Sequence, residues 1–287
     1  MGKIVIVGSG PAGCSAALYA ARAGQEVVVI SMGMGALSKA ELIQNYYGFE
    51  EGITGAELYR QGVAGAQAVG AEFITAEVVG LDYTGSLVVQ TTEGDYPADA
   101  VILATGAGRI APKIAGLAEH EGRGVSYCAT CDAFFYRGKT AAVLGSGEYA
   151  LHEVQALLPL AGKVILCTNG EPLTADFPEG VEICTEKLAA VEGEEKVSAL
   201  RLENGELLPV EGLFVALGVA GSAALARKLG APVENGRIVV DEKMQTGIPG
   251  LFAAGDCTGG LLQVCKAVYE GALAATEAIK MLRGKKR

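Results

Sequence analysis

The sequence predicts an α/β protein with two Rossmann-like domains, the second inserted in the first. Two glycine-rich turns, which begin at Gly8 and Gly145, each connect a short apolar strand to a helix. A further apolar strand at 251–254 ends in a Gly-Asp pair, which indicates a late return to the first domain. The domains that we expect are residues 1–110 together with 242–287, and residues 111–241.

The first domain opens with a βαβ unit. Residues 3–7 and 27–30 are short β-branched runs of the kind found in buried parallel strands. The alanine-rich residues 12–23 between them predict a helix that ends at Gly24. The later elements expected in this domain are a helix at 56–69, a hairpin of strands 77–83 and 87–91, a strand at 100–104 and a closing helix at 263–283.

The second domain repeats the strand–turn–helix pattern from residues 140–144 onward. The Asn204-Gly205 dipeptide between two apolar runs is the strongest short signal of a β-hairpin. The other strands expected here are 163–167, 197–202 and 206–210. The pattern loosens over 110–123, where we place the first crossing between the domains.

Composition excludes several classes of function. The net charge is −10 and the basic residues cluster only at 283–287, so we expect no nucleic-acid partner. No apolar run reaches the roughly 18 residues of a membrane span. Seven irregularly spaced cysteines do not fit a disulfide framework, so we expect a cytoplasmic protein.

The first glycine-rich turn has the G-x-G-x-x-G spacing typical of dinucleotide binding. Its first glycine allows the tight turn, its second lets the backbone approach a pyrophosphate, and its third lets the helix pack on the strand. An ordinary βα turn is the alternative. The second strand ends near Ser31 with no carboxylate for a ribose. The cofactor-binding residues expected here are Gly8, Ser9, Gly10, Pro11, Ala12, Gly13 and Ser31.

Cys128 and Cys131 form a C-x-x-C motif, which serves as a zinc half-site, a structural disulfide or a redox dithiol. A zinc site needs two further ligands, and the other cysteines form no second pair, so we predict no metal. A reducing compartment disfavours a structural disulfide, and a redox pair is favoured. Asp132 adjoins the second sulfur as a candidate acid–base group, with a helix cap as the alternative.

The stretch 250–256, Gly-Leu-Phe-Ala-Ala-Gly-Asp, resembles the second fingerprint of two-dinucleotide-binding flavoproteins. The resemblance implies FAD as the cofactor, with Asp256 on its ribityl chain and the next helix pointing its N-terminus at the flavin ring. A helix cap is the alternative role for Asp256. The further cofactor-binding residues expected are Asn45, Thr105, Gly106, Gly255, Gln263 and Val264.

Residues 127–139, Tyr-Cys-Ala-Thr-Cys-Asp-Ala-Phe-Phe-Tyr-Arg-Gly-Lys, resemble the redox segment of low-molecular-weight thioredoxin reductases. The order of parts matches that family across nearly the whole chain, and Asn-Tyr-Tyr-Gly-Phe at 45–49 is similar to its stretch before the second helix. The resemblance implies a homodimeric enzyme that reduces thioredoxin. In it Cys131 faces the flavin, Cys128 attacks the protein disulfide and Asp132 is the acid–base.

The family pattern breaks at the second glycine turn, where thioredoxin reductases bind NADPH. Bulky Tyr149 follows the turn, where we expect the phosphates to need room. The strand 163–167 is followed by Thr-Asn-Gly, with no arginine for the 2′-phosphate. This loss resembles the ferredoxin-dependent flavin thioredoxin reductases, so we expect ferredoxin as the electron donor. The basic residues that we consider for an acidic ferredoxin are Arg109, Lys113, Arg123, Arg137 and Lys139.

Three other interpretations stay open. The first is a flavin-dependent dithiol oxidase that passes electrons to oxygen. The second is an NADPH-dependent thioredoxin reductase with an unusual pocket. The third is a flavin-binding sensor or scaffold with a structural dithiol. Replacement of Cys128 by serine separates the enzymes from the scaffold, because only an enzyme has turnover to lose.

Overall fold

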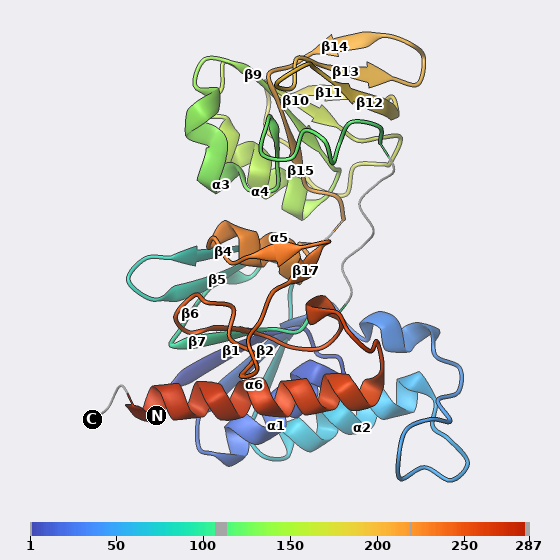
Figure 1. Ribbon diagram of the computed structural model, residues 1–287, viewed down its shortest axis with the longest axis vertical. Helices are drawn as coiled ribbons and strands as arrows, with labels where there is room; N and C mark the ends of the chain where they lie inside the picture. The colour runs from blue at the N-terminus through green and yellow to red at the C-terminus, as the bar shows by residue number, and fades with distance from the viewer. Residues whose placement is uncertain (1, 107–113, 219, 285–287) are drawn as a thin grey trace. The chain divides into compact units, whose positions relative to one another are not determined.

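The computed structural model describes residues 2–106, 114–218 and 220–284, and the chain divides into two compact units (Figure 1). The first unit contains residues 1–109 and 221–287, and the second contains residues 110–220. Each unit has its own five-stranded parallel sheet, which confirms the predicted fold class.

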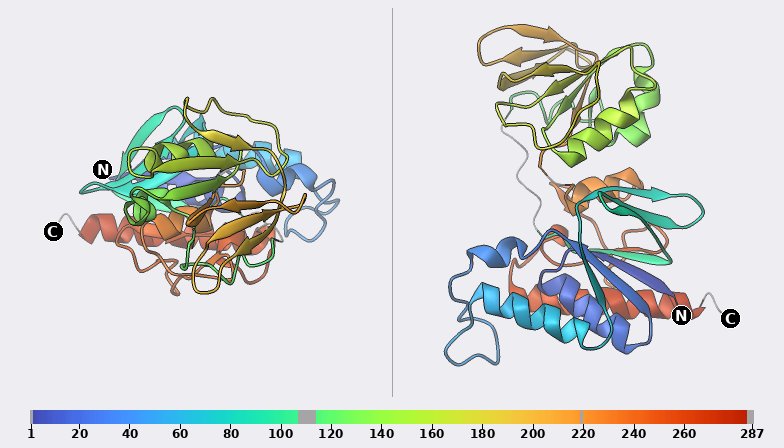
Figure 2. Two further views of the ribbon diagram at one scale, coloured as in Figure 1. Left: turned by 90° about the horizontal axis from the view of Figure 1, so that it is seen from above. Right: turned by 180° about the vertical axis from the view of Figure 1, so that it is seen from behind.

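The first unit is built on a parallel sheet of order β18-β7-β1-β2-β3. Its strands are β1 (Lys3–Val7), β2 (Glu26–Ser31), β3 (Glu72–Thr75), β7 (Ala100–Leu103) and β18 (Leu251–Ala253). Helices α1 (Pro11–Arg22), α2 (Gly55–Gln67) and α6 (Val264–Gly284) cover one face of this sheet, as Figures 1 and 2 show. The other face carries an antiparallel sheet of β4 (Val78–Tyr83), β5 (Leu87–Thr91) and β6 (Gly94–Ala98).

Alanine and glycine let α1 and α6 pack closely against each other. Ala16, Ala17 and Ala274 are fully buried between the helices and the sheet. A methyl group on Gly271 of α6 would lie 2.0 Å from the carbonyl oxygen of Ala12 in α1. This close approach brings the beginnings of the two helices to the same end of the sheet.

The chain returns to the first unit at Gly221, and not at residue 242 as the sequence predicted. Ser222 begins α5 (Ser222–Lys228), and its hydroxyl lies 2.7 Å from that of Thr105 at the end of β7. The short strands β16 (Val233–Glu234) and β17 (Arg237–Ile238) follow, and Arg237 lies against Gly259 of the first unit. These contacts join partners distant in sequence, which local patterns do not reveal.

The second unit has a parallel sheet of order β11-β10-β9-β15-β8 and an antiparallel sheet of order β12-β13-β14. The first sheet contains β8 (Val125–Ser126), β9 (Thr140–Leu144), β10 (Lys163–Cys167), β11 (Glu182–Cys184) and β15 (Gly212–Val215). The second contains β12 (Leu188–Glu192), β13 (Ala199–Leu202) and β14 (Leu207–Pro209), and the predicted Asn-Gly hairpin joins its last two strands. Helices α3 (Ala129–Asp132) and α4 (Glu148–Leu157) pack together beside β9.

Three short 3-10 turns complete the described elements: η1 (Gly35–Lys39), η2 (Ala133–Tyr136) and η3 (Asp256–Thr258). None of the described helices combines the length and the apolar character that a membrane crossing requires.

Candidate functional site

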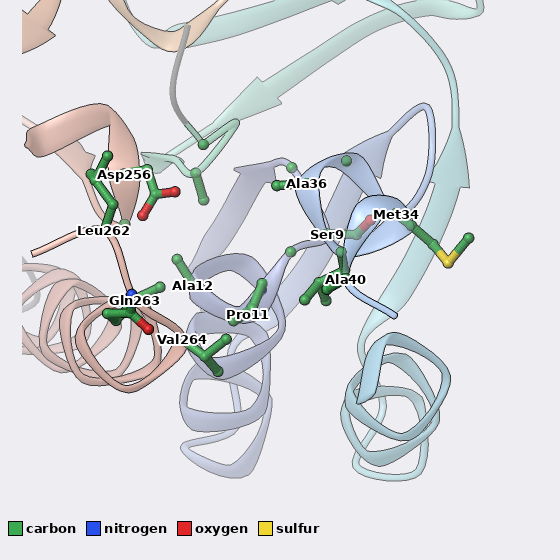
Figure 3. A pocket seen from close by; sticks show the side chains of 18 of the residues that line it. Ser9, Pro11, Ala12, Met34, Ala36, Ala40, Asp256, Leu262, Gln263 and Val264 are labelled. Atoms are coloured by element: carbon green, nitrogen blue, oxygen red, sulfur yellow. The ribbon is translucent and has the colours of Figure 1, made fainter. Parts of the chain in front are cut away.

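A cavity of about 430 Å³ lies in the first unit, at the carboxyl ends of β1, β7 and β18. Figure 3 shows Pro11 and Ala12 between two walls, one with Asp256 and Gln263 and the other with Met34. Asp256 is the one ionisable side chain among its described lining residues. The carboxyl ends of parallel strands are where open α/β sheets bind their ligands.

The cavity brings together nearly all the residues that the sequence predicted for the cofactor. The predicted residues that line it are Gly8, Ser9, Gly10, Pro11, Ala12, Asn45, Thr105, Gly106, Gly255, Asp256, Gln263 and Val264. Gly13 and Ser31 are the two that do not line it, because both lie behind the turn and support it.

The three glycines of the first turn are needed for different structural reasons: two avoid clashes within the fold, and one leaves open space. Gly8 has a φ of +107°, and a methyl group there would lie 2.4 Å from the carbonyl oxygen of Ala104. A methyl group on Gly13 would lie 1.8 Å from the carbonyl oxygen of Gly8. Gly10, the N-cap of α1, has no described heavy atom within 4 Å of such a methyl group. The fold therefore requires Gly8 and Gly13, whereas the space beside Gly10 is open to a ligand.

The N-terminus of α1 is suited to an anion. Gly10 makes no side-chain capping bond, and the first turn of the helix contains no acidic residue. The first backbone N–H groups and the partial positive charge of the helix are therefore uncompensated by side chains. A pyrophosphate is the kind of group that such a terminus binds.

Ser31 acts on the turn through Ser9. The Ser31 hydroxyl donates to the Ser9 hydroxyl at 2.7 Å, and the Ser9 hydroxyl donates to the carbonyl of Gly33 at 3.2 Å. The hydroxyl of Tyr59 in α2 lies 3.0 Å from that of Ser9. Tyr59 was not predicted, because a single tyrosine on a helix gives no pattern that points to this contact.

The turn that carries Asp256 is held by an ion pair between buried Glu270 and partly buried Lys266, which the sequence did not predict. Glu270 accepts from the N–H of Gly255 at 2.8 Å and from the hydroxyl of Thr258 at 2.9 Å. The Lys266 ammonium lies 3.0 Å from the same carboxylate and donates to the carbonyl of Gly255 at 2.8 Å. The detectable signal was a lysine and a glutamate four residues apart near the start of a largely apolar helix.

Two further contacts fix the rim of the cavity. The Asn45 amide donates to the side-chain oxygen of Gln263 at 2.9 Å, which joins the loop before α2 to the start of α6. The Thr105 hydroxyl accepts from the N–H of Ser222 at 2.8 Å. Asn45, Thr105 and Gln263, three of the predicted cofactor residues, thus lie at the rim of the cavity.

Cys128 and Cys131 form a disulfide in the second unit, with their Cα atoms 5.4 Å apart. Cys128 is buried and its sulfur accepts from the N–H of Cys131 at 3.1 Å, whereas Cys131 is exposed. Asp132 accepts from the hydroxyl of Ser126 at 2.7 Å and makes no side-chain capping bond to η2. The alternative of a helix cap for Asp132 therefore has no support. Burial, together with the charge of Asp132, raises the pKa of Tyr136.

The second glycine turn is covered by its own unit. The N–H of Thr174 donates to the carbonyl of Ser146 at 2.8 Å. A methyl group on Gly147 would lie 2.9 Å from the Thr174 hydroxyl, and one on Gly145 would lie 2.2 Å from the carbonyl oxygen of Ala216. Thr174 thus stands beside the turn, where a nucleotide pyrophosphate would bind in a working Rossmann unit.

Tyr149 does not block the phosphate position in the way that the sequence suggested. Its side chain is buried, and its hydroxyl donates to the carbonyl of Tyr127 at 3.1 Å. The residue points to the segment that carries the disulfide, and the contact with the glycine turn comes from Thr174.

The end of β10 offers little to a 2′-phosphate. Asn169 has a φ of +56°, and its side-chain oxygen accepts from the N–H of Leu188 at 2.9 Å. Lys187, a basic residue that the sequence analysis missed, packs its side chain against Gly170. Of the five basic residues considered for a ferredoxin contact, Arg109 and Lys113 lie outside the described residues. The others, Arg123, Arg137 and Lys139, are exposed in the second unit.

Comparisons with known proteins agree on one family. The profile of the pyridine nucleotide-disulphide oxidoreductase family matches residues 2–271. A thioredoxin reductase of Aquifex aeolicus is 36% identical, over 99% of this chain and 94% of its own. The atypical thioredoxin reductase TRi of Desulfovibrio vulgaris Hildenborough has a TM-score of 0.93 at 40% identity, and covers 99% of both chains. A ferredoxin-flavin thioredoxin reductase of Clostridium acetobutylicum has a TM-score of 0.75 at 36% identity, over 99% of this chain and 98% of its own.

One of these solved structures is described as a flavin enzyme, and the cavity of this chain fits FAD. Its volume of about 430 Å³ lies in the range of cofactor sites. The open side of Gly10 and the uncapped start of α1 suit the pyrophosphate, and Asp256 is an acceptor for ribityl hydroxyls. FAD is therefore the cofactor of this chain.

Proposed function

The chain belongs to the low-molecular-weight thioredoxin reductases, within the pyridine nucleotide-disulphide oxidoreductases, and we propose that its electron donor is ferredoxin rather than NADPH. Its family activity is flavin-dependent reduction of the thioredoxin disulfide. We also propose that it works as a homodimer, as the family resemblance implies, and in the cytoplasm, as its irregularly spaced cysteines indicate.

The observation that carries the donor assignment is the covered glycine turn of the second unit. Thr174 hydrogen-bonds to this turn, and no arginine occurs between the end of β10 and Lys187. Charge-assisted contacts to phosphate are among the strongest polar contacts in proteins, so their loss weakens NADPH binding severely. The similarity to a solved ferredoxin-flavin thioredoxin reductase supports the same donor.

The energetics permit electrons to flow in this direction. A plant-type ferredoxin near −400 mV and thioredoxin near −270 mV differ by about 130 mV, which is roughly 6 kcal/mol for two electrons. Bound FAD supplies the chemistry that joins one-electron donors to a two-electron disulfide.

The residues of the second unit perform the disulfide chemistry. Two electrons and two protons convert the Cys128–Cys131 disulfide into a dithiol. The Cys128 thiolate then attacks the thioredoxin disulfide, and Cys131 displaces reduced thioredoxin while the internal disulfide forms again. Asp132, held by Ser126, is the proposed group that takes and returns the proton. Cys131 is the sulfur proposed to face the flavin.

Exposed aromatic residues beside the disulfide support a protein substrate. The side chains of Phe134 and Phe135 are 65% and 67% exposed, and the Arg137 guanidinium lies 5.3 Å from the centre of the Phe134 ring. Exposed aromatics and arginine are enriched where proteins dock. Phe134 and Phe135 are three and four residues after Cys131 and Arg137 is six, so all three belong to the segment that thioredoxin must approach.

The test is anaerobic reduction of thioredoxin disulfide with each donor in turn. We expect turnover with reduced ferredoxin and none with NADPH, while an NADPH-dependent thioredoxin reductase in the same assay gives the reverse. The Cys128→Ser variant should keep its FAD and lose turnover with ferredoxin. Oxygen uptake with a dithiol and no ferredoxin turnover would instead assign an oxidase.

NADPH remains a second candidate donor because of Lys187. This lysine packs beside Gly170 at the end of β10, so it offers one cation near the place where the family grips the 2′-phosphate. Saturable NADPH turnover that falls in Lys187→Ala would favour this candidate over ferredoxin.

A further inference from the structure

We propose that helix α4 holds the redox segment through two side chains one turn apart, Tyr149 and Glu153, and that the buried carboxylate of Glu153 tunes the redox chemistry of the Cys128–Cys131 pair. The inference rests on the proposed function only in taking this pair as the working dithiol. Nothing in it depends on the identity of the electron donor.

The two contacts lie on either side of Cys128. The Tyr149 hydroxyl donates to the carbonyl of Tyr127 at 3.1 Å. Glu153 accepts a short hydrogen bond from the N–H of Ala129 through its Oε2 atom. Residues 149 and 153 are four apart, so both side chains project from one face of α4. Together they fasten the peptide groups before and after Cys128.

The group that binds the start of α3 is an acidic side chain from another helix. The Ala129 N–H is the first N–H of α3, and a neutral oxygen would satisfy it without bringing a charge. Glu153 is 1% exposed, and burial of a charge is expensive unless it has partners. The Ala129 N–H and His152, whose Nδ1 lies 3.4 Å from Oε1, are partners suited to a carboxylate.

The charge acts on the adjacent thiol. A cysteine at a helix N-terminus usually has a lowered pKa, because the helix favours the thiolate. A carboxylate bound one residue from Cys128 opposes this effect, since like charges disfavour each other. Glu153 therefore favours the neutral dithiol and the disulfide over the thiolate.

Other titratable groups face the same pair and must be accounted for. Asp132 on α3 is held by Ser126 and adds a second negative charge. Tyr136 follows on η2, while Tyr149 and His152 belong to α4. Only replacement of Glu153 itself isolates the contribution of its charge.

The experiment uses the full, FAD-loaded chain and reads thiol chemistry alone. Because Cys128 is buried, its ionisation after reduction is followed from pH 5 to 10 by the NMR chemical shift of its ¹³C-labelled β-carbon, which needs no reagent to reach the sulfur. Glu153→Gln keeps the shape and an acceptor oxygen but removes the charge. The matched control is Glu148→Gln, which removes a carboxylate from the first turn of the same helix.

We expect Glu153→Gln to lower the pH midpoint of Cys128 ionisation by about one unit, with Glu148→Gln near the parent. In dithiol buffers above that midpoint, the equilibrium should shift about tenfold toward the reduced pair, which is about 30 mV. Tyr149→Phe removes the hydrogen bond to Tyr127 but keeps the Glu153 charge, so its midpoint should equal that of the parent.

An unchanged midpoint in Glu153→Gln, or an equal shift in Glu148→Gln, would overturn the proposal. Glu153→Asp guards against misfolding, because it keeps the charge with one methylene fewer. If the pH midpoint of Cys128 in Glu153→Asp equals that of the parent, the charge of residue 153 sets the pKa of the thiol. A fall of one pH unit in Glu153→Asp contradicts the proposal. These readouts need neither ferredoxin nor thioredoxin, so a failed donor assignment and a failed inference are distinguishable.

Discussion

Gly10 and Gly13 lie three residues apart in the first turn, and methyl groups placed on them should have opposite consequences. A methyl on Gly13 would lie 1.8 Å from the carbonyl oxygen of Gly8, so α1 must move away from the strand by more than an ångström. Overpacking of this kind costs about 3 kcal/mol. For a domain of this size we expect the melting temperature of Gly13→Ala to fall by roughly 6–12 °C.

Gly10→Ala should instead preserve the fold and lose the cofactor. Gly10 has an ordinary φ of −68° and an open side, so alanine there changes the stability of the FAD-free protein by about 1 kcal/mol or less. Its methyl group would occupy the place where a pyrophosphate meets the start of α1. Loss of one charge-assisted hydrogen bond, about 1.5–3 kcal/mol, weakens FAD binding roughly 10- to 150-fold.

The assay combines two measurements on the same three proteins. Circular dichroism of the FAD-free protein gives the melting temperature, and quenching of FAD fluorescence on titration gives the dissociation constant. If Gly10→Ala binds FAD as tightly as the parent, the open side of this turn is not cofactor space and the assignment of the cavity fails. If Gly13→Ala melts with the parent, the packing argument fails.

Two further predictions concern buried groups. Glu270→Ala leaves Lys266 without its carboxylate, so it should destabilise the first unit by about 3 kcal/mol and lower the flavin content. The control Lys280→Ala, on the exposed side of α6, should change stability by less than about 0.5 kcal/mol. Equal melting temperatures of the two variants would refute this prediction. Burial raises the pKa of Cys14 to about 12 and of Cys257 to about 11, so in native protein at pH 8 iodoacetamide should label exposed Cys265 and spare both. Because the unfolded thiols ionise near pH 9 and the folded ones do not, stability should fall as the pH rises from about 9 toward 12; equal labelling of the three cysteines would contradict the burial argument.

The sequence predicted the parallel strands most accurately. Residues 3–7 and 140–144 are strands with the expected bounds, because β-branched runs before a glycine turn are a local and strong signal. Nine of the predicted cofactor residues line one cavity for a related reason, because they follow the ends of β1, β7 and β18 and parallel strands end at one edge.

Contacts between distant residues were beyond local patterns. The hydrogen bonds of Ser222 with Thr105 span 117 residues and place 221–241 in the first unit. The orientation of Tyr149 also escaped prediction, because the glycine motif alone does not tell which way the next side chain points. Its hydrogen bond to the carbonyl of Tyr127 depends on the packing of α4 beside the redox segment, which the sequence pattern does not show.

The most direct test of the central claim is an anaerobic titration of the bound FAD, followed by its visible absorbance. We predict that reduced ferredoxin bleaches the flavin stoichiometrically and that NADPH, even in large excess, leaves the spectrum unchanged. Rapid bleaching by NADPH at stoichiometric concentration would contradict the account of the second unit as a nucleotide fold that has lost its nucleotide.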